Sequence, residues 1–147
     1  MNGILKISKI KDGTIVDKFN TEKIVIVNNK FLDLGFNAIR SLLSGTGATV
    51  STVTKMQFGT GTSSPAITDT TLQSPISPIK ALSSVDYTDE TPSVLMKAYL
   101  LDYEGNGFTL GEAGLLTPSN ILVARAIYTP MEKTSDYNFT YEWTFTW

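Results

Sequence analysis

Apolar and polar residues alternate strictly in the last ten residues of the chain, NFTYEWTFTW. The odd positions carry five aromatic rings, those of Phe139, Tyr141, Trp143, Phe145 and Trp147. A period of two is typical of a β-strand with one covered face and one wet face. Burying one large apolar side chain stabilises a fold by about 1.5–3 kcal/mol, and a whole domain has a net stability of only about 5–15 kcal/mol. We therefore expect this face to be hidden, either in the chain's own core or against a neighbouring subunit.

Further β-strands are indicated along the rest of the chain. Ile4 to Ile10 and Thr14 to Phe19 flank a tight turn at Lys-Asp-Gly. Other strands are predicted at residues 23–27, 52–59, 79–87, 94–103, from about 108 onward, and at 121–128. The sequence EGNG is expected to join the 94–103 strand to a hairpin partner that starts near Phe108. The run ILVARAIY is apolar on both parities except at Arg125, which predicts a central strand covered on both faces.

The period changes to that of a helix at about residues 29–44. Polar residues recur there at spacings of three and four, and apolar residues fill most of what remains. We expect one buried α-helix with a narrow wet stripe. The predicted fold is thus mainly β: a single domain over residues 1–147, built as an antiparallel β-sandwich of about eight or nine strands with this one helix.

One charged pair is predicted inside the sandwich. The segment EAGLLTPSNILVAR folds symmetrically about Pro118 and Ser119, a favourable type I turn pair. Laid antiparallel, Thr117 opposes Asn120, Leu115 opposes Leu122, and Glu112 opposes Arg125. A buried guanidinium requires a partner. We expect Glu112 and Arg125 to form a cross-strand ion pair with a structural role.

A long segment rich in Thr, Ser, Gly and Pro, TGTSSPAITDTTLQSP, follows the strand that ends at Gly59. It is interpreted as an ordered loop, fixed to the body at Ile67, Leu72 and Ile76. Loops of this kind commonly lie over a neighbouring subunit. The candidate inter-subunit contacts are Thr60, Thr62, Pro65, Ile67 and Leu72.

Composition excludes several kinds of chemistry. The chain contains neither cysteine nor histidine, so disulfides, thiolate catalysis and a Ser-His-Asp triad cannot be built from it. A net charge of -2 with scattered lysines does not favour nucleic-acid binding. The start lacks a signal peptide and no stretch resembles a membrane span, which predicts synthesis in the cytoplasm. We expect no catalytic, cofactor-binding or metal-binding residues and no small-molecule substrate.

Two motifs are set aside, and one enzyme hypothesis is kept as a rival. DYEGNG, at residues 102–107, partly imitates a calcium loop, but the closing position falls on Ala113 and a turn explains the same letters. FGTGTSSP lacks the residues of a nucleotide loop, and its glycines are interpreted as allowing positive φ at a strand exit. A glycosidase using a carboxylate pair drawn from Asp102, Glu104 and Glu112 is a rival hypothesis, although their spacing does not call for it.

Several motifs resemble a recurring pattern in small bacteriophage virion proteins. The pattern combines a Gly-Thr-Gly-Thr stretch, an Asp-Thr-x-Leu, an acidic-aliphatic E-x-G-L, L-V-A-R-A, P-x-x-K-T and a final strand of alternating aromatics. The matching positions are Gly59 to Thr62, Asp69 to Leu72, Glu112 to Leu115, Leu122 to Ala126 and Pro130 to Thr134. They span residues 52 to 147, about two-thirds of the chain.

The resemblance implies a non-enzymatic β-rich subunit of a tail, neck or collar, baseplate, fibre attachment or capsid. Such a subunit works in the virion as a homo-oligomer that binds other virion proteins. The alternative is a carbohydrate-binding or host-recognition module. That alternative predicts a monomer with Trp143 or Trp147 exposed for stacking on sugars.

Overall fold

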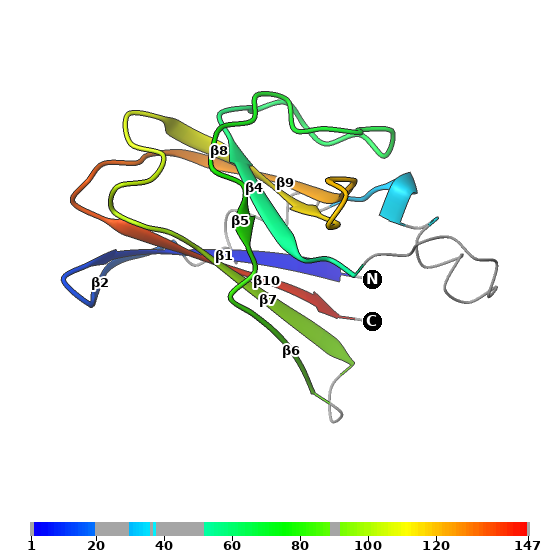
Figure 1. Ribbon diagram of the computed structural model, residues 1–147, viewed down its shortest axis with the longest axis horizontal. Coiled ribbons are helices and arrows are strands. Elements are labelled where there is room, and N and C mark those ends of the chain that lie inside the picture. Colours follow the sequence, from blue (N-terminus) through cyan, green and yellow to red (C-terminus); the bar gives the residue numbers. More distant parts are fainter. Residues whose placement is uncertain (1, 20–29, 36, 38–51, 89–91, 147) are drawn as a thin grey trace.

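The chain folds as two antiparallel sheets packed face to face. The computed structural model describes residues 2–19, 30–35, 37, 52–88 and 92–146, and within this part it forms ten strands in two five-stranded sheets. Sheet A has the order β2-β1-β10-β7-β6, and sheet B has the order β3-β9-β8-β4-β5. Figure 1 shows sheet B stacked above sheet A, with both chain ends together at one side. The predicted β-sandwich is confirmed.

The strands of sheet A are β1 (Asn2–Lys11), β2 (Thr14–Phe19), β6 (Ser84–Thr88), β7 (Ser93–Leu100) and β10 (Asn138–Thr146). Those of sheet B are β3 (Lys30–Phe31), β4 (Lys55–Gly59), β5 (Lys80–Ala81), β8 (Thr109–Leu116) and β9 (Leu122–Glu132). The β1–β2 hairpin turns through Asp12 and Gly13, both at positive φ. The predicted strand at residues 23–27 lies outside the described residues.

The aromatic face of β10 forms the centre of the core. Phe139, Tyr141 and Trp143 are fully buried and Phe145 is 5% exposed, while Trp147 lies outside the described residues. These four rings face sheet B, and the Tyr141 ring lies 4.4 Å from the ring of Phe58 on β4. Four of the five predicted rings therefore fill the chain's own core.

The opposite face of β10 is polar and carries a small charge network. Glu142 bridges Lys6 on β1 at 3.3 Å and Lys97 on β7 at 3.2 Å. Burial opposes the charged form of Glu142, but the hydrogen bonds from Lys97 and Lys6 outweigh it and lower the pKa of this carboxyl. The register explains the contact, because Lys6, Glu142 and Lys97 lie opposite one another on three adjacent strands.

One prediction about a connection is wrong. β7 and β8 do not form a hairpin, since β7 pairs with β10 in sheet A and β8 with β9 in sheet B. The segment between them contains Gly105 and Gly107 at positive φ and crosses from one sheet to the other. Its eight residues, 101–108, exceed the two to five residues of ordinary hairpin loops.

The predicted helix does not begin at residue 29. Lys30 and Phe31 instead pair with Arg125 and Ala124 as β3. Helical backbone starts at Asp33, after Leu32 donates its amide to the carbonyl of Val123 at 3.0 Å. Residues 33–35 and 37 are helical, and residues 38–44 of the predicted helix lie outside the described residues. Lys30 and Phe31 pair with the open edge of β9, so the helical backbone begins only after them, at Asp33.

Candidate functional site

Glu112 and Arg125 meet on the face of sheet B that points away from sheet A. Arg125 Nε lies 2.8 Å from Glu112 Oε2, and the two side chains are 4% and 0% exposed. This is the pair expected from the sequence. β8 and β9 supply one residue each, and both positions are buried although they lie outside the main core.

The register that brings them together differs from the predicted one. Glu112 lies opposite Ile127 and Arg125 opposite Gly114, so the ion pair is diagonal. The reason is the turn, in which Asn120 adopts φ 64° and Thr117 pairs with Ile121 instead of Asn120. A further irregularity at Leu115/Leu116 shifts the pairing again. Two residues on the same face of adjacent strands still reach each other diagonally when one side chain is as long as arginine.

The long loop at residues 60–78 closes over this pair. Glu112 Oε1 accepts the amides of Ser74 at 2.7 Å and Gly61 at 3.2 Å, and Oε2 accepts the amide of Gln73 at 3.1 Å. The carboxylate is therefore held by backbone N–H groups from both ends of the loop. Figure 1 shows the loop, in green, lying above β4, β8 and β9.

Arg125 fastens the middle of the same loop. Its Nη1 lies 2.8 Å from Asp69 Oδ2, and its Nη2 donates to the carbonyl of Ser63 at 3.1 Å. Asp69 Oδ2 also accepts the amide of Ala66 at 2.9 Å. We call Glu112, Arg125 and Asp69 the loop clip. Planar guanidinium groups form such multiple bonds with fixed geometry.

Glycines allow the loop to lie this close to sheet B. A β-carbon at Gly59 or Gly61 would lie 2.5 Å from Glu112 Oε1, and one at Gly114 would lie 2.5 Å from Leu122. Neither Gly59 nor Gly61 has positive φ. The interpretation of FGTGTSSP as a positive-φ strand exit is therefore wrong. Gly59 and Gly61 instead allow the loop backbone to lie close to the buried carboxylate of Glu112.

Apolar anchors complete the attachment, and they correct the predicted inter-subunit contacts. Leu72 is 3% exposed and clusters with Leu32, Leu116 and Leu122, and Pro65 is also buried. Leu72 and Pro65 thus pack on their own subunit and are not available to a neighbour. Ile67 is not an anchor, because its side chain is 50% exposed. Thr60 is half-buried, and Thr62 and Ile67 remain on the surface.

A hydrogen-bonded tyrosine pair lies beneath the clip, inside the sandwich. The hydroxyls of Tyr128 and Tyr141 are 3.1 Å apart, and the Tyr128 hydroxyl donates to the carbonyl of Glu112 at 3.3 Å. Burial raises the pKa of both phenols well above the usual value. The pair links the aromatic strand β10 to β8 through β9.

The loop that imitates a calcium site is occupied by a lysine. Lys133 Nζ donates to Asn106 Oδ1 at 2.9 Å, to the carbonyl of Thr134 at 2.9 Å and to that of Asp102 at 3.3 Å. Burial lowers the pKa of this ammonium. In the described part of the chain, no group of three or more acidic residues is placed to hold a metal ion. An ammonium thus stands where the motif would hold a cation.

The three carboxylates of the glycosidase hypothesis are not brought together. Glu104 pairs with Lys80 and accepts the amide of Leu101 at 2.8 Å, and Asp102 is exposed on the same loop. Glu112 is buried in the loop clip on the far side of sheet B and has no surface that a substrate could reach.

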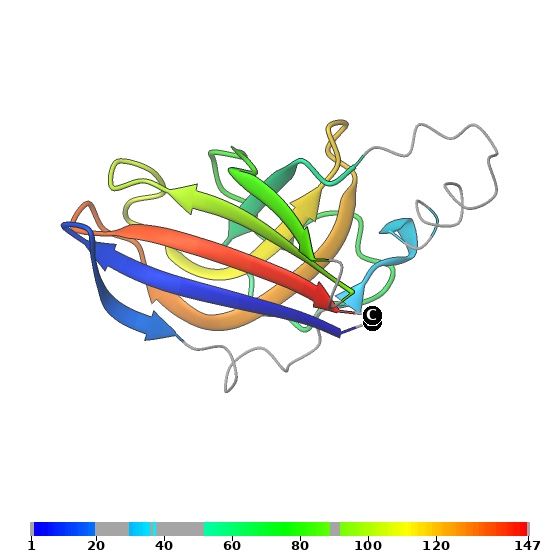
Figure 2. The ribbon, with the colours of Figure 1, turned by 90° about the horizontal axis from the view of Figure 1, so that it is seen from below.

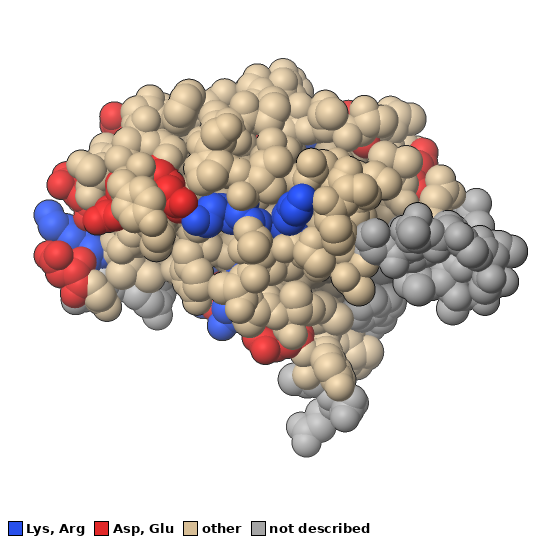
Figure 3. All heavy atoms as spheres, in the orientation of Figure 1, with Lys and Arg blue, Asp and Glu red and all other residues tan. Residues whose placement is uncertain are grey.

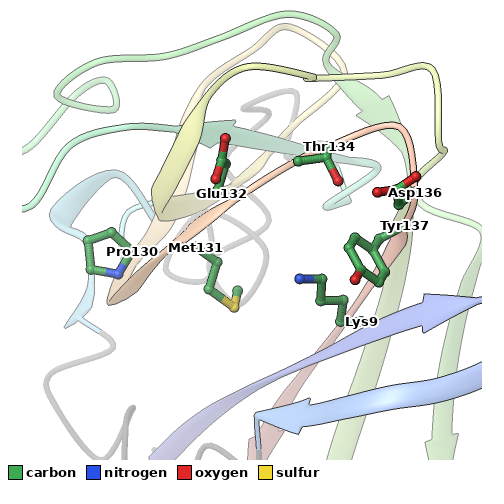
Figure 4. Close-up of a pocket in the computed structure, with 7 residues that line it drawn as sticks. All are labelled: Lys9, Pro130, Met131, Glu132, Thr134, Asp136 and Tyr137. Carbon is green, nitrogen blue, oxygen red and sulfur yellow. The ribbon is translucent and has the colours of Figure 1, made fainter.

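A pocket of about 370 Å³ opens at the end of β9, between the two sheets. Figure 4 shows Lys9 reaching from β1 toward Tyr137, and its ammonium lies 3.7 Å from the ring centroid. Glu132 and Asp136 add two carboxylates to the lining. Lys9 occupies one face of the ring, which leaves that face closed to a sugar. The sequence did not predict this pocket, because Lys9 and residues 130–137 are far apart along the chain.

The surface itself combines charges of both signs. On the described part of the face in Figure 3, blue atoms form a short row near the middle and red atoms gather beside it. Trp143, which a sugar-binding platform would need at the surface, is fully buried. Within the described ranges no helix is long and apolar enough to cross a membrane. No family model, curated protein or solved structure matches the chain.

Proposed function

We propose that this chain is a non-enzymatic structural subunit of a bacteriophage virion, located in the tail, neck or collar, baseplate or capsid surface. It assembles with further copies of itself and binds neighbouring virion proteins. The proposal starts from the sequence pattern that resembles small virion proteins. Synthesis in the host cytoplasm precedes incorporation into the particle.

The observation that carries the proposal is the loop clip. The buried charges Glu112 and Arg125 bind segments of this chain's own loop and hold it in one shape against sheet B. A buried ion pair of this kind requires partners for all its polar atoms, and the loop backbone supplies them. A fixed surface is what a subunit needs in order to fit its neighbours repeatedly.

Surface side chains supply a second argument. Ile67, Val85, Tyr87 and Tyr103 are each at least half exposed. Exposed tyrosines are common at the centres of protein interfaces. A subunit that binds other proteins would bury such side chains at its interfaces.

The test is the mass of the purified protein in solution, followed by its location in particles. We expect native mass spectrometry to give a multiple of the 16.1 kDa chain mass. We also expect antibodies against the chain to label one fixed place on phage particles in electron micrographs. A monomer that quenches its tryptophan fluorescence on glycan binding would favour the carbohydrate-binding alternative instead.

A further inference from the structure

The segment between β7 and β8 contains Asn106 and Gly107, a dipeptide with its own chemistry. Figure 2 shows this segment, in yellow-green, at the end of the sandwich away from the chain termini. The backbone nitrogen that follows an asparagine can attack the carbon of the side-chain carboxamide. A glycine at the following position offers the least steric resistance, because it has no β-carbon. The side chain of Asn106 is exposed, so it is also open to solvent.

Deamidation at Asn106 needs no reagent other than water. The bond from Gly107 N to Asn106 Cγ forms and the bond from Cγ to Nδ2 breaks. The side-chain nitrogen leaves as ammonia and takes the proton of the Gly107 amide with it. Water then opens the cyclic imide, at one carbonyl to give aspartate with an ordinary backbone and at the other to give isoaspartate. Either product carries a carboxylate in place of a neutral amide.

Lys133 binds both reacting groups. Its Nζ donates to Asn106 Oδ1 at 2.9 Å, and its backbone carbonyl accepts the Gly107 amide, also at 2.9 Å. The other end of the carboxamide is fixed as well, since Asn106 Nδ2 donates to the carbonyl of Asp102 at 2.7 Å. A reaction of this kind requires the two atoms to meet in a defined geometry. The folded segment therefore opposes the reaction until these hydrogen bonds open.

Lys133 is a buried cation whose contacts are neutral. Its Nζ donates to oxygens of Asp102, Asn106 and Thr134, of which two are backbone carbonyls and one is a carboxamide. None of the ion pairs in the described part of the chain includes Lys133, and Glu104 on the same segment is paired with another lysine. Buried charges are normally paired, because their desolvation is costly.

Aspartate at position 106 would supply the missing negative charge. It would place a carboxylate oxygen where Oδ1 of Asn106 accepts the ammonium of Lys133. The hydrogen bond from Nδ2 to Asp102 would be lost in the exchange. That bond joins two neutral groups, and a hydrogen bond between two charged groups is the stronger of the two.

We propose that Asn106 is a deamidation site and that Lys133 acts on it twice. The contacts of Lys133 slow the reaction in the folded chain, and its ammonium pairs with the aspartate that the reaction forms. The ion pair attaches segment 101–108 more firmly to the residue that follows β9. This inference does not depend on self-assembly.

Timed incubation at mildly alkaline pH, followed by peptide mass spectrometry, measures deamidation at each asparagine. We expect Lys133→Met to raise the rate at Asn106 by about tenfold or more, the factor that corresponds to one hydrogen bond to a charged group. The same dipeptide at Asn2 and Gly3, in β1, is the internal control and should react equally in both chains. Lys97→Met, which removes a lysine that contacts Glu142 instead, is the matched control variant.

The natural chain gives a second measurement that does not require a variant to fold. In guanidinium chloride the contacts of Lys133 are lost, and Asn106 should deamidate at least about tenfold faster than in the folded chain. Equal rates in the folded and unfolded chains would overturn the slowing by Lys133. A rate in folded Lys133→Met no higher than that of the natural chain would overturn it as well.

Asn106→Asp tests the ion pair, because it installs the product directly. Its effect on the urea midpoint should be more favourable in the natural background than in Lys133→Met, as expected for two residues that interact. A midpoint change of the same size in both backgrounds would show that the carboxylate and the ammonium do not interact. That result would overturn the pairing of Lys133 with the product.

Discussion

Both carboxylate oxygens of Glu112 are fully occupied. Oε1 accepts the amides of Gly61 and Ser74, and Oε2 accepts the amide of Gln73 and the guanidinium of Arg125. The side chain is completely buried, so none of these bonds is shared with solvent. Removing one charge of such a pair leaves the other buried and unpaired, and this cost dominates the energetics of the site.

We expect Arg125→Met to lower the free energy of unfolding by about 3–5 kcal/mol, because it leaves the Glu112 carboxylate without its cation. The matched control is Lys6→Met, which breaks a surface ion pair whose lysine is 42% exposed. Such surface pairs contribute only about 0–1 kcal/mol. Urea denaturation of the two variants measures the difference. Equal losses would show that the Glu112–Arg125 pair is no more important than a surface pair.

Residue chemistry alone predicted this ion pair but not its geometry. An arginine in an apolar strand required an acid, and the facing strand offered only Glu112. The register of β8 against β9 depended on Asn120, whose left-handed backbone adds a residue to the turn. Asparagine tolerates this conformation better than most residues, which is the signal that would have corrected the prediction.

At the scale of elements, the long loop behaves as a third layer on sheet B. Its two ends run beside β4, where the amide of Thr60 donates to Ser74 and the amide of Ile76 donates to Phe58, each at 2.9 Å. Its middle is held by the loop clip and by Leu72. A loop with this many internal attachments is expected to open only in a cooperative event.

Hydrogen exchange tests that cooperativity. In the natural protein we expect the amides of Gly61, Gln73 and Ser74 to exchange slowly, since all three donate to a buried carboxylate. In Arg125→Met they should exchange faster together, by about tenfold or more, because the middle of the loop loses its attachment. The Gly107 amide, bonded to the Lys133 carbonyl at 2.9 Å, reports on a separate loop and should not change. Independent changes at the three amides would contradict a single cooperative layer.

At the scale of the whole molecule, the tyrosine pair couples stability to alkaline pH. Unfolded tyrosines ionise near pH 10, whereas burial keeps Tyr128 and Tyr141 neutral to higher pH. Above about pH 10 the folded state therefore binds more protons than the unfolded state. The free energy of unfolding must then fall as pH rises through the folded pKa values. Below about pH 10 these two tyrosines do not make the free energy of unfolding depend on pH.

The double variant Tyr128→Phe/Tyr141→Phe should show a shallower loss of stability between about pH 9 and pH 11 than the natural chain. Its phenylalanines cannot ionise in the unfolded state, so the proton linkage disappears. Urea midpoints across this range measure the slope. Tyr103→Phe is the control, because its ring is 73% exposed. If the double variant lost stability as steeply as the natural chain, the buried pair would not be the source of the linkage.

The sequence by itself determined most of the strands other than β3, which face of β10 is apolar, and that Arg125 needs an acidic partner. These follow from side-chain periodicity and from the cost of burying charge, which act over short stretches. Only the tertiary structure decided that β7 and β8 belong to different sheets and that the loop at residues 60–78 folds back onto sheet B. Those outcomes depend on which distant strands compete for the same edge and on how closely backbones can approach at Gly59, Gly61 and Gly114.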